Sequence, residues 1–392
     1  MVENESIMTN EPAPLIPAGE KRSARPHNPG SRPRPAGRAL PEIIAEQLRT
    51  LQLQHRAVLS TGSVEAIHRM RVSTRKLQAS LDLLQVKSDH LKIAKLKSRL
   101  RNWRRVLSSV RNYDVFLKLI SLETSPRKGG RGEQFASLVS ILEQKRKERI
   151  AEVQAYLESA NISKFAASLG VRIPPLPPSR STVGDVGAPP VERATAGAEH
   201  MGSLIEIDPA YMKKWPDENK IALRTADRID QRLAEFQALA ARAHETTHPR
   251  ELHQLRIAAK RLRYLLEVVS DQGYGDATRA LVSLRAIQDR IGDWHDLEAL
   301  EEEIIDRVSG RKFLKRNLTE SAHMLLAAAH MEKKKSAFVK RLFPIKVARS
   351  IPMSAQKLAR ALRRSTLPPK ARNEAALQEA GKTSNEPGTP SP

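Results

Sequence analysis

An eleven-residue pattern occurs twice in this chain, 185 residues apart, and it constrains the fold more than any other feature. The first copy runs from Ile67 to Leu77, the second runs from Leu252 to Leu262, and the two align without a gap. Apolar residues recur in both copies at intervals of three and four, which is the period of an amphipathic helix. The duplication therefore predicts two homologous helical halves that pack with a pseudo-two-fold axis.

The amino-acid composition favours helices and excludes several kinds of site. Aromatic residues make up only 4% of the chain, and Val, Ile and Tyr rarely alternate with polar residues. This pattern argues against a β-sandwich or a β-barrel and predicts an all-α protein. The chain has no cysteine, which excludes a disulfide scaffold, a thiol nucleophile and a Cys-ligated zinc or iron–sulfur site.

Three segments that are rich in Pro and poor in apolar residues divide the chain. We expect a disordered N-terminal tail over 1–38, a linker over 171–208, and a basic, mostly disordered C-terminal tail over 344–392. Within the last segment only Ala355 to Arg364 has the period of a helix. The helical halves are then residues 39–170 and 209–343.

Periodicity and helix-terminus signals predict the individual helices. Pro41 suits the first turn of a helix that ends at the break Ser60-Thr61-Gly62-Ser63, and Asp217 is the expected N-cap of a helix that runs to Ala243. The other predicted helices span 64–84, 91–107, 133–159, 250–270, 277–290, 296–307 and 313–343, and one more begins at Asp114 after a kink near Ser108-Ser109.

Each repeated helix carries two stripes of side chains. The apolar stripe is typical of a core and contains Ile67, Met70, Thr74, Leu77, Leu81 and Leu84 in the first half, and Leu252, Leu255, Ala259, Leu262, Leu266 and Val269 in the second. The neighbouring stripe is basic and contains His68, Arg71 and Arg75 in the first half, and His253, Arg256, Lys260 and Arg263 in the second.

The two basic stripes predict a binding site for an anion. Like charges three or four residues apart destabilise a helix, and no Asp or Glu within the stripes offsets them. A solvated surface explains a single stripe, whereas two copies that both begin with His favour a shared groove. Arg and Lys suit phosphate oxygens. The surrounding cations disfavour protonation of His68 and His253, and a bound phosphate would reverse this effect.

The overall charge and the absence of export signals narrow the class of protein. A net charge of +23 predicts a polyanionic partner. No apolar run approaches the roughly 18 residues that a membrane span needs. The N-terminal residues also lack the basic start and the apolar stretch of a secretory signal. We therefore expect a cytoplasmic protein without a membrane span.

The repeats resemble a known family. His68 to Leu77 and His253 to Arg263 are similar to the two signature helices of the CHAD family, the conserved histidine α-helical domain. Arg111-Asn112-Tyr113-Asp114-Val115 resembles the Arg-Asp-x-Asp-Val stretch of that family, and Gly292-Asp293-Trp294-His295-Asp296-Leu297 resembles its counterpart in the second half. The resemblance covers about residues 39–343, apart from the linker.

The resemblance implies two pseudo-symmetric four-helix bundles around a basic central pore, and binding of inorganic polyphosphate, often on polyphosphate granules. It implies a non-enzymatic protein, and we expect neither a cofactor nor a bound metal. The residues that it assigns to polyphosphate are His68, Arg71, Arg75, Lys76, His253, Arg256, Lys260, Arg261 and Arg263, followed by Lys97, Arg101, Arg104 and Arg105 on the next helix.

Non-specific nucleic-acid binding is the alternative function. A sequence pI of about 10.4 and the basic tails allow it. The basic stripes lack aromatic residues on which bases could stack, and no helix-turn-helix or zinc-finger signature is present. Weak binding of nucleic acid is still expected, because its backbone and polyphosphate offer similar charge.

Two motifs point to enzymes, and both are weak. His244-Glu245-Thr246-Thr247-His248 matches the H-E-x-x-H pattern of zinc proteases, but Pro249 disfavours helical backbone at His248. The two imidazoles are therefore not expected on one helical face. Asp114 and Asp296 are candidate carboxylates for phosphoryl transfer, but both lie at predicted helix starts, where Asp is common.

Overall fold

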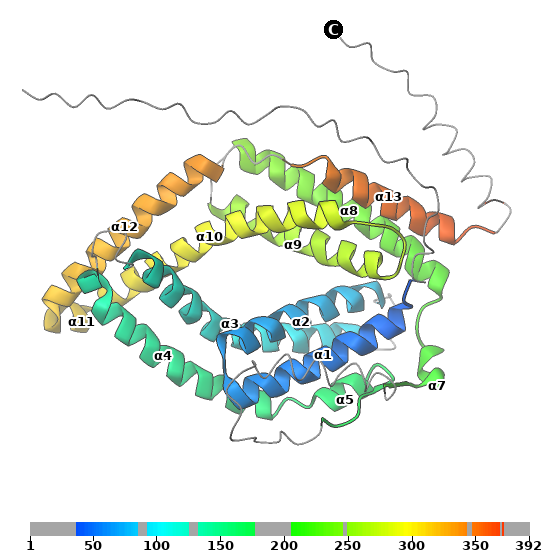
Figure 1. Ribbon diagram of the computed structural model, residues 1–392, viewed down its shortest axis with the longest axis horizontal. Coiled ribbons are helices and arrows are strands. Elements are labelled where there is room, and N and C mark those ends of the chain that lie inside the picture. The colour runs from blue at the N-terminus through cyan, green and yellow to red at the C-terminus, as the bar shows by residue number, and fades with distance from the viewer. Residues whose placement is uncertain are drawn as a thin grey trace, which may run out of the picture. The chain divides into compact units, whose positions relative to one another are not determined.

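Two sets of helices dominate the computed structural model, which describes residues 37–84, 92–124, 132–176, 205–245, 249–342, 347–368 and 371. The first set contains α1 (Leu40–Thr61), α2 (Val64–Leu84), α3 (Ile93–Glu123), α4 (Gly132–Glu158) and α5 (Ile162–Ala167). The second set contains α7 (Pro209–Met212), α8 (Glu218–Glu245), α9 (Pro249–Asp271), α10 (Thr278–Val308), α11 (Arg311–Arg316), α12 (Leu318–Leu342) and α13 (Ser350–Ser365). Figure 1 shows both sets. The described fold is all-α apart from one pair of two-residue strands, as predicted.

Two predicted helix ends are confirmed by their hydrogen bonds. α1 ends at Gly62, whose φ of 54° lies in the left-handed region that favours glycine. The N–H of Gly62 donates to the Val58 carbonyl oxygen at 2.9 Å. α8 begins after Asp217, whose carboxylate accepts a hydrogen bond from the N–H of Lys220 at 3.1 Å.

Two predicted helix breaks are wrong, because α3 and α10 are each one continuous helix of 31 residues. The expected kink near Ser108 and Ser109 is absent. The two hydroxyls donate to carbonyl oxygens of their own helix, those of Arg104 at 2.6 Å and Val106 at 2.8 Å. Buried apolar residues on both sides of each expected break keep the backbone helical, since packing outweighs local propensity.

One predicted helix is divided. The sequence indicates a single helix over 313–343, whereas the structure has α11 and α12 separated at Asn317. Asn317 has φ of −133° and ψ of 57°, outside the helical region, and its N–H donates to the Phe313 carbonyl oxygen. Asparagine accommodates such a helix end because its short polar side chain bonds to nearby backbone.

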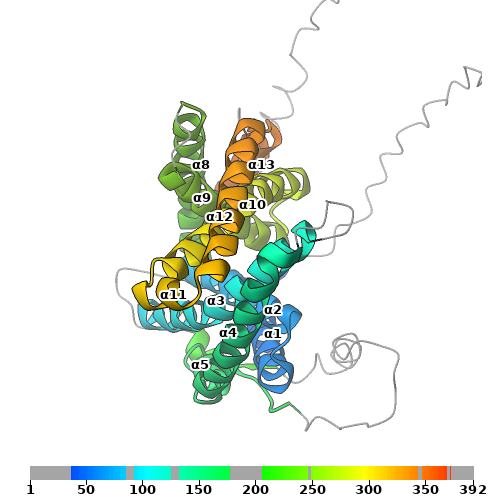
Figure 2. The same cartoon turned by 90° about the vertical axis from the view of Figure 1, so that its left-hand side faces the viewer.

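Helices that are neighbours in the chain pack against each other, and the two sets meet along the repeated helices. In the first set α1 packs against α2, α2 against α3, and α3 against α4. In the second set the same order links α8, α9, α10 and α12. Between the sets, α2 contacts α9, α3 contacts α10, and α4 contacts α12. Figure 2 is viewed from the side on which α4 and α12 lie.

The predicted apolar stripes of α2 and α9 form part of the core. Every one of their twelve residues is exposed by 1% or less. Eleven of them, all but Thr74, belong to a hydrophobic cluster that contains residues of both sets. A second cluster forms where the C-terminal parts of α3 and α10 meet α4 and α12, and it includes Phe116, Leu142, Ile304 and Met331. Burial of the apolar stripes places the adjacent basic stripes close to the junction between the sets.

The described structure extends into the predicted linker and C-terminal tail. β1 (Val171–Arg172) and β2 (Glu206–Ile207) pair antiparallel and join the two ends of the linker. α13 lies within 344–392, and it packs against α8 and α10. Its period was recognised over Ala355 to Arg364, but its start at Ser350 and its packing were not predicted. Residues 1–36, 177–204, 344–346, 369–370 and 372–392 of the predicted tails and linker lie outside the described residues.

We predict that Leu358→Ala in α13 lowers the free energy of unfolding by about 2–5 kcal/mol. Leu358 is 1% exposed and belongs to the shared core cluster, so the substitution leaves a cavity there. Urea denaturation followed by circular dichroism measures the change. Met353→Ala on the same helix is the control, because Met353 is 66% exposed and its loss should cost less than about 0.5 kcal/mol. Equally small effects would show that α13 does not stabilise the core.

Candidate anion-binding site

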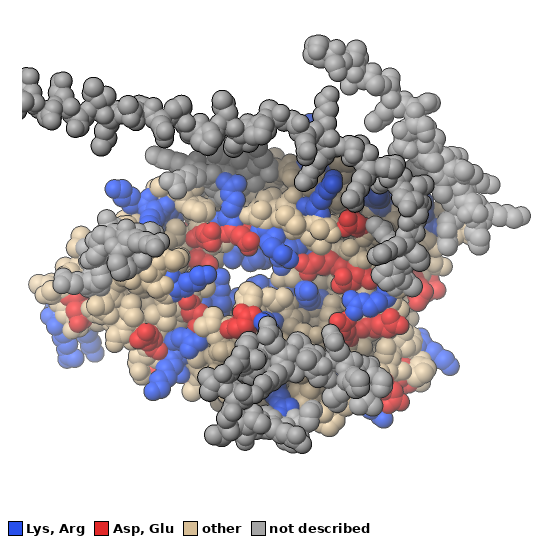
Figure 3. All heavy atoms as spheres, in the orientation of Figure 1, with Lys and Arg blue, Asp and Glu red and all other residues tan. Residues whose placement is uncertain are grey.

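A cavity of about 640 Å³ lies where the repeated helices α2 and α9 meet α3 and α10. Its walls contain His68, Arg71, Val72, Arg75, Lys76, Ser108, Arg111 and Asn112 from the first set, and Arg256, Lys260, Arg263, Tyr264, Glu267, Arg285, Gln288, Asp289 and His295 from the second. Figure 3 shows a gap between the two sets of helices, with Lys and Arg side chains on its border. Two distant parts of the sequence thus contribute cations to one cavity.

Arg71 of α2 and Arg256 of α9 bring hydrogen-bond donors to the cavity from the two sets. The Nε atom of each is buried and has no hydrogen-bond partner among the residues that the structure describes. Such atoms are uncommon in folded proteins, because a buried N–H without an acceptor costs free energy. Both side chains line the cavity, so an anionic ligand there would lie beside two guanidinium groups whose hydrogen-bonding capacity is not fully used within the described residues.

The crowding of cations changes their protonation. Burial, followed by the charges of Arg256, Arg75, Arg71 and Arg111, lowers the pKa of Lys260 to about 6. Burial, followed by the charges of Arg75 and Arg111, lowers the pKa of Arg71 to about 9. The pKa of Arg256 is also lowered, mainly by burial. Holding these charges in the cavity is therefore unfavourable, and a bound anion would offset the cost.

Three histidines lie in the cavity wall or next to it. His68 and His295 line the cavity, and the imidazole of His253 packs edge-on against that of His295 with ring centroids 5.2 Å apart. Partial burial lowers the pKa of all three, and the nearby charges of Arg71 or Arg256 lower it further. Protonation of His68 and His253 is thus disfavoured in the free protein. Burial is the main cause, and the neighbouring cations that the sequence indicated are a further one.

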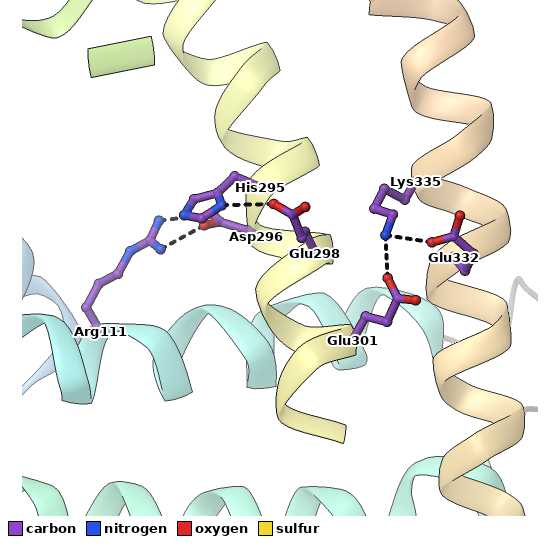
Figure 4. A network of polar contacts seen from close by, with 7 residues as sticks. All are labelled: Arg111, His295, Asp296, Glu298, Glu301, Glu332 and Lys335. Carbon is purple, nitrogen blue, oxygen red and sulfur yellow. Dashed lines mark hydrogen bonds and ion pairs between the residues drawn. The ribbon is translucent and has the colours of Figure 1, made fainter. Parts of the chain in front are cut away.

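An ion pair joins α3 and α10 beside the cavity. Arg111 of α3 donates to both carboxylate oxygens of Asp296 of α10, at 2.8 and 3.0 Å. Figure 4 shows this pair next to His295, whose Nδ1 atom lies 3.5 Å from Oε2 of Glu298. The planar guanidinium matches the carboxylate in a two-pronged contact, which fixes the two helices relative to each other.

Both aspartates that were considered for phosphoryl transfer are ion-paired within continuous helices. Asp296 accepts from Arg111, and Asp114 accepts a hydrogen bond from Arg146 of α4. The prediction that both aspartates lie at helix starts is wrong, because α3 and α10 continue through these positions. Their contacts indicate that both carboxylates connect helices.

Gly292 leaves room for the Arg256 side chain beside α10. A Cβ atom at this position would lie 3.3 Å from the Nη2 atom of Arg256, closer than an ordinary van der Waals contact. The absence of a side chain allows the Arg256 guanidinium to lie against α10. The glycine of the 292–297 motif thus serves the placement of a cavity arginine and does not end the helix.

Comparison with known proteins identifies the family. The family model of the CHAD domain matches residues 42–304 of the chain. The chain belongs to the CHAD family. Among solved structures, the CHAD domain from the plant Ricinus communis is similar at 19% identity and a TM-score of 0.48, covering 79% of this chain and 94% of that chain. PptA from Streptomyces chartreusis is similar at 16% identity and a TM-score of 0.40, covering 86% of this chain and 96% of that chain. No curated protein matches the sequence.

The cavity of this CHAD domain contains seven of the thirteen residues that the sequence assigned to polyphosphate. They are His68, Arg71, Arg75, Lys76, Arg256, Lys260 and Arg263. Arg263 also lies near a carboxylate, since its Nε atom is 3.6 Å from Oε1 of Glu267. Tyr264 lies under the same guanidinium, 4.5 Å from ring centroid to Cζ. Both basic stripes therefore reach the cavity over most of their length.

The other six assigned residues lie outside the cavity wall. His253 packs on His295, and Arg101 and Arg105 are exposed on α3. Three have protein partners: Lys97 pairs with Asp82, Arg104 donates to Oε1 of Gln78 at 2.9 Å, and Arg261 lies 3.4 Å from Oε1 of Glu235. The basic run on α3 thus contributes less to the cavity than the sequence indicated, because most of it faces away.

Several cavity residues were not assigned from the sequence. Those on α3 are Ser108, Arg111 and Asn112, and those on α10 include Arg285, Gln288, Asp289 and His295. Intervals of three, four and seven residues separate members of the α10 group, which is the spacing of side chains on one face of a helix. This spacing is the sequence signal that identifies them. The predicted break before residue 296 separated this face into two helices and concealed the spacing.

The zinc-protease motif is not covered by the structure, since residues 246–248 lie outside the described residues. Within the described ranges, no group of three or more His, Asp or Glu side chains is arranged to hold a metal ion. None of the helices in those ranges is both long enough and apolar enough to cross a lipid bilayer.

We predict that the stability of this CHAD domain rises from pH 7.0 to pH 8.5 and that Lys260→Met removes part of the rise. The pKa of Lys260 is about 6 in the folded protein against an ordinary value of 10.5, so the unfolded chain binds more protons in this range. The free energy of unfolding then increases with pH, by about 1–2 kcal/mol over this interval for one such group. Urea denaturation at both pH values measures it. Equal pH dependence in the two proteins would contradict the lowered pKa.

Proposed function

We propose that this CHAD protein binds inorganic polyphosphate in the cavity between its repeated helices and catalyses no reaction on it. One observation supports the proposal above all others. Arg71 and Arg256, from the two sets of helices, line the same cavity, and each has a buried Nε atom without a hydrogen-bond partner among the described residues. Phosphate oxygens are acceptors that match arginine in geometry and charge, and a chain of phosphates offers them in succession.

The proposed mechanism is capture by many weak contacts. Arginine and lysine side chains of α2 and α9 neutralise successive phosphates, which removes the repulsion that lowers the pKa of Lys260. His68 and His253 take up protons as the local charge becomes less positive and donate further hydrogen bonds. Association with long polyphosphate would bring the protein to polyphosphate granules in the cytoplasm.

We also interpret the two sets of helices as pseudo-symmetric four-helix bundles. α1, α2, α3 and α4 would correspond to α8, α9, α10 and α12, which follow the same order of packing. The sequence repeats on α2 and α9 support this pairing. The halves 39–170 and 209–343, joined by the linker over 171–208, would then be the two repeats, with α13 as an addition to the second.

Double-stranded nucleic acid fits the cavity less well than polyphosphate. Arg71, Arg256 and Lys260 line a cavity of about 640 Å³ between helices, into which a single chain of phosphates would fit more readily than a duplex. Arginines on the surface, such as Arg101 and Arg105, remain able to contact nucleic acid weakly and without sequence preference. Competition between the two polyanions separates the two functions.

We predict that Arg71→Gln/Arg256→Gln weakens binding of long-chain polyphosphate by about 100-fold or more at moderate salt, because two charge-assisted contacts are lost. The slope of log affinity against log salt should fall by about two. Fluorescence anisotropy with labelled polyphosphate over a salt series measures both. The variant should also melt at a higher temperature without ligand, since two repelling charges are gone.

The matched control is Arg105→Gln/Arg261→Gln, which removes the same charge outside the cavity wall. Arg105 is exposed, and Glu235 keeps its pair with Arg232 when Arg261 is replaced. This variant should lose less than about tenfold in affinity. Each protein is also tested against double-stranded DNA of equal charge as competitor. Equal losses in the two variants, or displacement by DNA, would favour diffuse charge attraction and nucleic-acid binding.

We predict that polyphosphate binding at pH 8.0 takes up protons, and that Lys260→Met reduces the uptake. Lys260 is mostly neutral in the free protein at this pH, and a polyanion beside it raises its pKa. Binding linked to proton uptake becomes weaker as pH increases. Isothermal titration calorimetry in buffers with different ionisation enthalpies counts the protons. If wild type and variant take up the same number of protons on binding, the proton uptake would be assigned to the histidines or to polyphosphate itself.

A further inference from the structure

Lys260 differs from the other cations of the cavity because its amine is a nucleophile when it carries no proton. The side chain is half-buried on α9 and lines the cavity. The charged groups that chiefly act on it are arginines of three helices, namely Arg71 and Arg75 on α2, Arg111 on α3 and Arg256 on α9. Desolvation beside other cations is the environment that activates a lysine amine, and the pKa near 6 agrees with it.

The same cavity holds donors for a phosphate group next to this amine. Arg256 precedes Lys260 by one helical turn, so both side chains lie on one face of α9. Arg256 and Arg71 bring guanidinium groups to the cavity from α9 and α2, and the Nε atom of each has no partner among the described residues. A volume of about 640 Å³ admits a small molecule. A ligand whose phosphate binds the arginines would bring its other end to the Lys260 amine.

The geometry points to Lys260 as a site of acylation by small acyl phosphates, with acetyl phosphate as the simplest member of the class. The amine nitrogen attacks the acyl carbon, and the bond between that carbon and the phosphate oxygen breaks. The oxygen keeps the electron pair, and the proton lost from nitrogen passes to the departing group, which leaves as hydrogen phosphate. The product is an amide at Lys260, which no longer carries a charge at any ordinary pH.

This inference uses the cavity of the proposed function, but it does not require polyphosphate to bind there. The labelling reaction is run without polyphosphate, so its outcome is independent of polyphosphate affinity. Lys260 gains and loses its charge reversibly when its amine binds or releases a proton. Acylation would remove this charge permanently. Where polyphosphate occupies the cavity, it should protect Lys260 from the reagent, which connects the two proposals in a separate measurement.

The test treats the full chain with acetyl phosphate at pH 7.5 and measures the rate of acetylation at each lysine by mass spectrometry. We expect Lys260 to react about tenfold or more faster than Lys220, an exposed lysine of α8. Acetic anhydride, which has no phosphate, serves as the matched reagent. The preference for Lys260 over Lys220 should be several times larger with acetyl phosphate, because only that reagent is held by the arginines.

Two further measurements keep the test independent of protein folding. Arg256→Gln should reduce the ratio of acetyl phosphate labelling to anhydride labelling at Lys260. The fraction of neutral amine in the free protein affects both rates equally and cancels in this ratio. If this variant does not fold, inorganic phosphate added to the wild type takes its place. It should slow labelling by acetyl phosphate more than labelling by the anhydride, because it competes only with acetyl phosphate for the arginines, while the rise that it causes in the pKa of Lys260 affects both reagents. An equal preference with both reagents, or labelling of Lys260 no faster than Lys220, would overturn the inference.

Discussion

The packing of α2 against α9 is the contact on which the rest of the described structure depends. Burial of the two apolar stripes brings the adjacent basic stripes together, because the stripes are side by side on each helix. Each large apolar side chain buried in this contact contributes about 1.5–3 kcal/mol, and the shared cluster contains many of them. The fold therefore tolerates the unfavourable burial of Arg71, Arg256 and Lys260. Their lowered pKa values record that cost.

Acidic residues along α10 connect this helix to three others, α3, α12 and α4. Asp296 is paired with Arg111, and farther along the helix Glu301 and Glu303 pair with cations of α12 and α4. Lys335 contacts both Glu301 and Glu332 at 2.6 Å, as Figure 4 shows. These carboxylates hold the helices around the second hydrophobic cluster together. Glu301 and Glu303 are paired away from the cavity, whereas Asp296 offsets one cavity cation, Arg111. Cationic residues still outnumber acidic ones in the cavity wall.

Much of the fold followed from local sequence patterns, and the errors have a common physical cause. The helix start at Asp217 and the helix end at Gly62 were predicted because capping depends on residues close together in the chain. The breaks expected near Ser109 and Gly292 were wrong because those residues have weak helix propensity, while burial in the core holds the helix. At Gly292 the missing side chain makes room for Arg256, a contact between residues that are distant in the sequence.

The sequence by itself determined the helical class, the buried stripes of α2 and α9, and the excess of cations beside them. Each of these follows from a period of three to four residues, which can be read from the sequence of one helix without information about the helices that pack against it. Only the tertiary structure decided which cations meet. It brought seven of the thirteen assigned residues into one cavity, added Arg111 and His295, and left Arg101 and Arg105 at the surface. The physical reason is that the direction of a side chain across a helix interface depends on how two helices cross, and this is set by the whole core.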